Sequence, residues 1–168
     1  MHNLLARLWR YLSLGVMGTF TAFDTTTLWE ADGTDSLKAA NAFQMVLIQS
    51  GASLTSSGFQ VYGDLTNEVA NGQGYTTGGI VLTGVTLTRS VGTTTFAFTG
   101  PSPGWTATGT GIPAWRWMVV YVNATLNGHV KPLIGFELGD ATPADVPLTP
   151  SGSTITITGS LLTITHTP

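Results

Sequence analysis

The stretch NEVANGQGYTTGGIVL, residues 67–82, constrains the fold more than any other part of the chain. Its glycines are closely spaced, at Gly72, Gly74, Gly78 and Gly79. Because glycine takes positive φ at no steric cost, this backbone is predicted to fold tightly on itself before a strand begins at Ile80. Tyr75 is the one large side chain in the turn. Its ring is expected to pack, and its hydroxyl to bond nearby backbone.

A phosphate-cradling loop is the alternative interpretation of these glycines. A dinucleotide fingerprint needs such glycines at the opening of a helix and an acidic residue about 20 positions further on. Here the glycines lead into a β pattern, which favours a structural turn. Glu68 is expected to accept backbone N–H bonds from that turn. Asp64 would form a carboxylate pair with Glu68 only if the segment were helical.

Three segments carry a resemblance to a known family. The first segment, residues 67–79, resembles the stretch NEV-x-G-x-GY-x-x-GG of a group of tailed-bacteriophage virion proteins. Residues 43–48 are similar to an early strand of that group, and residues 117–121 with 132–136 to a later strand pair. Residues 1–42 and the insert 100–112 depart from its pattern. The positions of the first motif are Asn67, Glu68, Gly72, Gly74, Tyr75, Gly78 and Gly79.

Charge is scarce in this 168-residue chain. Charged residues make up 9%, against roughly 25% in soluble domains, so neutral polar residues must build the exterior. Such a surface suits a protein covered by partners or by its own copies, although a small β protein with a neutral surface is the alternative. No basic cluster exceeds the pair Arg7 and Arg10, so no nucleic-acid partner is expected. The absence of cysteine excludes disulfides and thiolate metal sites.

Residues 1–14 are predicted to form a short helix with an apolar stripe at intervals of four. A helix of this length is marginal alone, so it either caps its own domain or docks on a neighbouring subunit as an arm. The apolar run 11–17 imitates a signal peptide, but Ser13 and Gly15 break it and it is too short to cross a bilayer. No membrane partner is expected. The stripe consists of Leu4, Leu8 and Leu12, with Leu5 and Trp9 beside it.

From Phe43 onward the pattern is β, punctuated by Gly, Pro, Ser and Asn. It predicts an antiparallel β-sandwich or jelly-roll-like domain over residues 43–168, preceded by a helical arm and irregular lead-in over residues 1–42. The expected strands are 43–49, 59–62, 80–88, 94–98, 115–122, 132–138, 154–158 and 161–165.

Two of these segments carry finer predictions. Strand 115–122 has apolar residues on both faces, with Trp115, Trp117, Val119 and Tyr121 on one of them, which predicts a central strand. Residues 154–165 are predicted to be a hairpin with a two-residue loop, and an edge suited to pairing between subunits.

Residues 100–113 are predicted to be a loop, because Pro101, Pro103 and Pro113 interrupt any strand. An exposed tryptophan in such a loop is a typical interaction site, so Trp105 is a candidate contact. The alternative is that Trp105 folds back on its own domain.

No group of residues in the sequence has the pattern of a catalytic or metal site. His2, His129 and His166 are scattered, and the acidic run 32–35 fits turn chemistry and a helix cap better than a calcium loop. No G-x-S-x-G elbow is present. We therefore expect no enzyme activity, no metal and no cofactor.

The resemblance implies a structural protein of the virion, and we expect a capsid decoration or cement protein on the outside of the phage head. Its expected partners are the major capsid protein and copies of itself, in a homo-oligomer such as a homotrimer. One alternative is a tail fibre-base or baseplate component. Another is a glycan-binding β module in which Trp105 or Trp115 stacks on sugars. The expected contact residues are Leu4, Leu8, Trp9, Leu12 and Trp105.

Overall fold

The computed structural model describes residues 20–26, 42–90, 93–98, 104–126, 128–140, 144–157 and 162–165. Their strands pair antiparallel in every sheet, which confirms the predicted all-β class. The predicted arm lies outside the described residues, so its helix stays a prediction, as do the contacts expected of Leu4, Leu8, Trp9 and Leu12. The acidic run 32–35 lies outside them as well.

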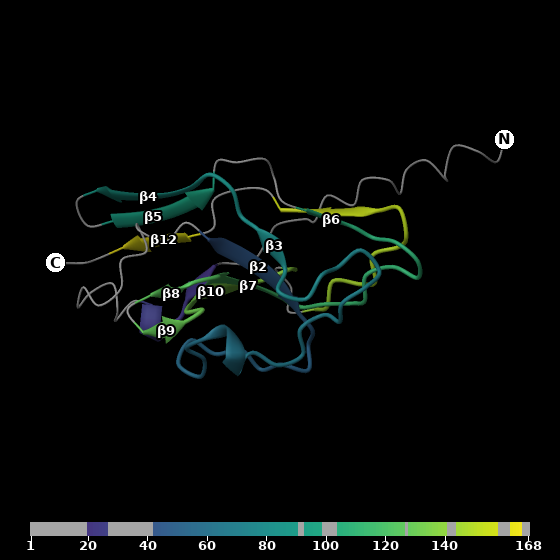
Figure 1. Ribbon diagram of the computed structural model, residues 1–168, viewed down its shortest axis with the longest axis horizontal. Coiled ribbons are helices and arrows are strands. Elements are labelled where there is room, and N and C mark those ends of the chain that lie inside the picture. The colour runs from purple at the N-terminus through teal and green to yellow at the C-terminus, as the bar shows by residue number, and fades with distance from the viewer. Residues whose placement is uncertain are drawn as a thin grey trace.

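The largest sheet has five strands in the order β1-β10-β7-β2-β3 (Figure 1). β7 lies in the middle, and every residue after Trp117 is buried, which confirms the predicted central strand. The register sets Val119 opposite both Val46 and Phe136. The strands are β1 (Thr21–Ala22), β2 (Phe43–Ile48), β3 (Ile80–Val81), β7 (Trp117–Val122) and β10 (Leu133–Leu138).

This sheet carries a hydrophobic core on each face. Side chains alternate across a strand, so Met45 and Val120 join one cluster, together with Trp105 of the overlying layer. Val119 joins the other cluster, which includes Leu54. Figure 1 shows β6 and the neighbouring strands above the sheet and the loops that follow β2 below it. The five-stranded sheet is therefore covered on both sides.

One antiparallel ladder runs through residues 93–165. It starts at the β8–β9 pair, continues through β7–β10 and two isolated bridges, and ends in β6–β11 and β5–β12. The pairs β6–β11 and β5–β12 belong to sheets that are separate from the five-stranded sheet. Its further strands are β5 (Thr93–Phe98), β6 (Gly104–Thr106), β8 (Thr125–Leu126), β9 (His129–Val130), β11 (Thr154–Thr156) and β12 (Leu162–Thr165).

The predicted hairpin over residues 154–165 is wrong. β11 pairs with β6, and β12 pairs with β5, so the two segments belong to separate sheets and never pair with each other. The reason is the long ladder, in which both segments form the returning strand. A short turn signal in sequence cannot compete with partners that lie about 50 to 70 residues away along the chain.

Two other predicted strands also differ. Residues 59–62 contribute only an isolated bridge at Val61, beside a short 3-10 helix (η3, Tyr62–Asp64). The predicted strand 80–88 splits into β3 and β4 (Val85–Ser90), because the chain turns at Gly84, whose φ is 66°. β3 stays in the five-stranded sheet, whereas β4 crosses to the three-stranded sheet β12-β5-β4.

The tryptophans correct the sequence interpretation. Trp105 lies in β6 opposite Ile155 and is 4% exposed, so the expected exposed contact is wrong and the fold-back alternative is confirmed. A strand of three residues therefore fits between Pro103 and Pro113. Trp115 pairs with Val146 and packs in a different core from Trp117, because β7 begins only at Trp117.

Three glycine-to-alanine variants test this fold. At Gly79 the φ is 77° and a Cβ would lie 1.8 Å from the Met45 carbonyl oxygen, so we expect a loss of at least about 2 kcal/mol in the free energy of unfolding. Gly72 has positive φ but open space, so its loss should be about 1 kcal/mol. Gly63→Ala is the neutral control. Urea unfolding measures all three, and equal midpoints would contradict the packing at Gly79.

Candidate functional site

The carboxylate of Glu68 is the centre of the candidate site. Its Oε1 accepts hydrogen bonds from the Gly78 backbone N–H at 2.7 Å and from the Tyr75 hydroxyl at 2.8 Å. Its Oε2 accepts a hydrogen bond from the Tyr62 hydroxyl. The expectation that Glu68 accepts a backbone bond from the tight loop is confirmed. We call Tyr62, Glu68, Tyr75, Gly78 and Tyr121 the Glu68 cluster.

Tyr75 connects this carboxylate to the central sheet. Its side chain is buried, and its hydroxyl accepts the Leu47 N–H at 3.1 Å while it donates to Glu68. Its ring lies 5.7 Å from that of Trp105. The predicted packing and backbone bonding of Tyr75 are therefore confirmed, although the backbone partner belongs to β2 rather than to the turn itself.

Tyr62 and Tyr121 complete the cluster. Their rings stack with centroids 4.6 Å apart, and the Lys131 ammonium lies 5.2 Å above the Tyr62 ring. The Tyr121 hydroxyl lies 2.9 Å from the Gly78 carbonyl oxygen, to which it can donate, and it also contacts the side chain of Gln44. Sequence reasoning missed these two tyrosines, because each lies on a separate element and neither belongs to the glycine motif.

The three tyrosines keep their protons at neutral pH. Burial raises the pKa of Tyr75 well above its usual range, and burial together with the hydrogen bond to Glu68 does the same for the pKa of Tyr62. Burial and then the charge of Glu68 raise the pKa of Tyr121 to about 12. These hydroxyls therefore act as hydrogen-bond donors and not as bases. The cluster is suited to holding a loop in place.

The glycine turn itself is fixed from the other side by β6 and the residues after it. Gly72 and Tyr75 exchange backbone hydrogen bonds across the turn. The Gln73 carbonyl oxygen accepts from Thr108 N–H at 2.9 Å, and its side-chain oxygen accepts from Thr110 N–H at 2.8 Å. Gly74 has a φ of 92°, and a Cβ there would lie 2.0 Å from the Thr106 carbonyl oxygen. The turn needs its glycines for conformation and for close approach.

Asn67 and Asp64, two further positions considered in the sequence, lie outside the Glu68 cluster. Asn67 has a φ of 59°, and its carbonyl oxygen accepts the Gln49 N–H at 2.8 Å, so it continues the ladder from β2. Asp64 caps the 3-10 helix by accepting the N–H groups of Gln60 and Val61. Its role is therefore separate from the Glu68 cluster, and the conditional carboxylate pair does not form.

Glu137 is a buried carboxylate that sequence reasoning missed. It lies in β10 opposite Met118 and is 5% exposed. Burial raises the pKa of Glu137 to about 7, because desolvation disfavours the charged form. A single acidic residue inside an apolar strand gave the only sequence signal for it.

A surface ion pair joins two loops at the edge of the sheet. The Arg116 guanidinium donates to Asp145 at 2.7 Å, and the Ser50 hydroxyl donates to the same carboxylate at 2.8 Å. The hydrogen bond from Ser50 and the ion pair with Arg116 lower the pKa of Asp145. Exposed pairs of this kind contribute little to stability.

Within the described residues, no three His, Asp or Glu side chains gather closely enough to ligate a metal ion. In the same part of the chain, no helix has the length and apolar character needed to cross a membrane. Trp105 and Trp115 are 4% and 0% exposed, so neither offers the exposed stacking surface that the glycan-binding alternative requires.

Comparison with known proteins adds no identity: no family model, curated protein or solved structure matches the chain.

Tyr75→Phe tests the cluster. The variant leaves the buried Leu47 N–H without its acceptor and removes one donor to Glu68, so we expect a loss of about 1–3 kcal/mol in the free energy of unfolding. Thr154→Val is the control, since it removes a hydroxyl pair with Thr106 that is exposed. Chemical denaturation of both variants measures the difference. A Tyr75→Phe loss as small as that of the control would contradict the proposed role.

Glu137 predicts a pH dependence of stability. Its folded pKa of about 7 exceeds the value near 4.5 of an unfolded chain, so the folded state binds more protons between these values. The contribution of Glu137 to the free energy of unfolding should therefore be fully present below pH 4.5. This contribution should fall by roughly 2–4 kcal/mol as the pH rises to 7. Denaturation of Glu137→Gln at several pH values should show a flatter profile than the parent. Identical profiles would contradict this.

Proposed function

We propose that this chain is a structural subunit of a tailed-phage particle, a decoration protein that binds the outside of the head shell as a homo-oligomer. The observation that carries the proposal is the stretch 67–79, which resembles a motif of phage virion proteins and lies at the centre of a hydrogen-bonded cluster. Glu68 accepts bonds from Tyr62, Tyr75 and Gly78, so the motif holds the fold together.

The low charge of the chain supports the same proposal. Charged residues make up 9% of the sequence, so neighbouring copies repel one another weakly. Large apolar side chains also reach the surface of the described part, at Val81, Val130 and Leu148. The centres of protein interfaces are typically depleted in charged residues. An exterior built mainly from Thr, Ser and Gly is likewise poor in charged residues.

In the proposed mechanism the protein holds the shell together passively. The arm of residues 1–14 would insert its apolar stripe between neighbouring capsid subunits, and each buried leucine would contribute roughly 1.5–3 kcal/mol. The symmetry of the shell repeats that contact at every copy. Trp105 takes no part in the contact, because it is buried in the core of its own domain.

Deletion of residues 1–14 tests the mechanism. We expect the affinity for purified phage heads, measured by cosedimentation, to fall by at least about 100-fold. The deletion removes several leucines, each of which would contribute about 1.5–3 kcal/mol to binding. Leu4→Ser with Leu8→Ser keeps the chain length and should lose affinity in the same direction.

The matched control is Arg7→Gln with Arg10→Gln, which alters residues of the same segment away from the stripe. This variant should bind heads as the parent does. Undiminished occupancy of the deletion variant would contradict the arm mechanism. Failure of the intact protein to bind heads at all would contradict the proposed function.

A further inference from the structure

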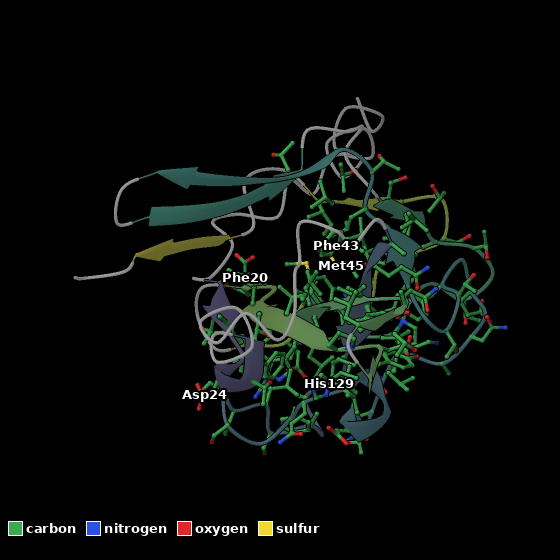
Figure 2. All side chains as sticks on the ribbon, turned by 60° about the vertical axis from the view of Figure 1, so that its left-hand side comes forward. Phe20, Asp24, Phe43, Met45 and His129 are labelled. Atoms are coloured by element: carbon green, nitrogen blue, oxygen red, sulfur yellow. The ribbon has the colours of Figure 1, made fainter. Side chains whose placement is uncertain are left out.

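The two-stranded sheet β6-β11 covers one core of the five-stranded sheet. Trp105 and Ile155 lie opposite each other in its register, and both side chains are buried. Phe43 and Met45 belong to the same core, and Figure 2 shows their labelled side chains between the five-stranded sheet and this layer. One face of the small sheet is therefore buried.

The other face of this sheet consists of small polar side chains. Thr106, Thr154 and Thr156 are exposed, and the hydroxyl oxygens of Thr106 and Thr154 lie 3.1 Å apart. A Cβ at Gly104 would lie 3.5 Å from the Cγ2 atom of Thr154, so Gly104 lies on the same face. No charged residue lies on β6 or β11. The exposed face is therefore uncharged, and its hydroxyls can both donate and accept hydrogen bonds.

The edge of the sheet beyond β6 is covered by the glycine turn. The Thr108 N–H donates to the Gln73 carbonyl oxygen at 2.9 Å. A Cβ at Gly74 would lie 2.0 Å from the Thr106 carbonyl oxygen, so the two backbones are in close contact. β6 is thus paired with β11 on one side and packed against the turn on the other.

β11 forms the opposite edge, and no further strand of the described residues pairs with it. The Ala107 N–H donates to the Ser153 carbonyl oxygen, so the alternation of the antiparallel ladder directs the backbone groups of Ile155 toward β6. The N–H and C=O groups of Thr154 and Thr156 consequently point away from β6. Figure 1 shows β11, in yellow, beside β6 in the layer above the five-stranded sheet. Such an edge is a template for another strand.

We propose that β11 pairs with β11 of a second copy of this chain, antiparallel about a two-fold axis at Ile155. In this register Thr154 lies opposite Thr156 of the second copy, and the outward backbone groups of these two residues exchange hydrogen bonds. The two-stranded sheets of both copies then join into one continuous sheet. The core of each copy lies on one side of that sheet, and the threonine face of each copy lies on the other.

The sequence favours a second copy over an unrelated strand. A two-fold interface requires a surface that complements itself, and Thr154-Ile155-Thr156 reads the same in both directions. Opposed threonines can satisfy each other, because each hydroxyl both donates and accepts a hydrogen bond. Natural edge strands that avoid such pairing carry charged residues or proline. Residues 151–157 contain neither.

Cysteine cross-linking tests the register, because the chain contains no cysteine of its own. Opposed Cα atoms in an antiparallel pair are about 4.5–5.5 Å apart, within the range that a disulfide spans. A mixture of Thr154→Cys and Thr156→Cys chains should therefore form the mixed dimer, under mild oxidation, at least about ten-fold faster than Thr106→Cys chains form a dimer. Thr106 is the matched control, since it is an exposed threonine on the same face but one strand further from the axis.

Charge substitution gives a second, independent result. Thr154→Lys with Thr156→Lys should lose self-association in light scattering, because like charges would face each other across the axis. Thr154→Glu with Thr156→Glu should lose it as well, and a mixture of the two double variants should form a mixed dimer, which also shows that both variants fold. Thr76→Lys with Thr77→Lys adds the same charge to exposed positions of the glycine turn and should associate as the parent does.

Cross-linking of the position-154 and position-156 chains no faster than that of Thr106→Cys would overturn the proposal. So would a parent chain that is monomeric, or a lysine double variant that associates like the parent. The inference names a contact between copies for the homo-oligomer proposed above, and it rests on the proposed function only for its place on a phage head. Light scattering of the purified chain tests the contact, whereas cosedimentation tests the binding to heads, so the two proposals fail separately.

Discussion

The carboxylate of Glu68 imposes the constraint on which the arrangement of the domain depends. Glu68 receives donors from a 3-10 helix, from a glycine turn and from a side chain that also binds β2. A buried or half-buried carboxylate that lost these donors would be left unsatisfied, at a cost larger than that of an ordinary hydrogen bond. The loops on one side of the sheet are therefore fixed relative to the central strands.

A second constraint is the long ladder that joins residues 93–165. It carries the chain from the middle of the five-stranded sheet to the edge of the overlying layer, and it gives Trp105 and Ile155 a common place in the core. The glycine turn closes against this ladder through Gln73. Turn and ladder together hold the all-β fold in which the central sheet carries a core on both faces.

The sequence predicted the parts of this structure that depend on local chemistry. The β class, the central position of residues 117–122 and the roles of Tyr75 and Glu68 all follow from alternation, turn composition and glycine conformation. Pairing between distant segments does not, which is why the hairpin over residues 154–165 was wrong. The burial of Trp105 depends on that pairing too, so it could not be predicted from its own neighbours.

The proposed function requires that other chains cover the charge-poor exterior of this domain. Electron cryomicroscopy of tailed-phage heads mixed with this protein tests that proposal most directly. We expect density for this domain on the outer surface of the head, repeated with the shell symmetry. Density confined to the tail, or particles that lack the protein altogether, would contradict it.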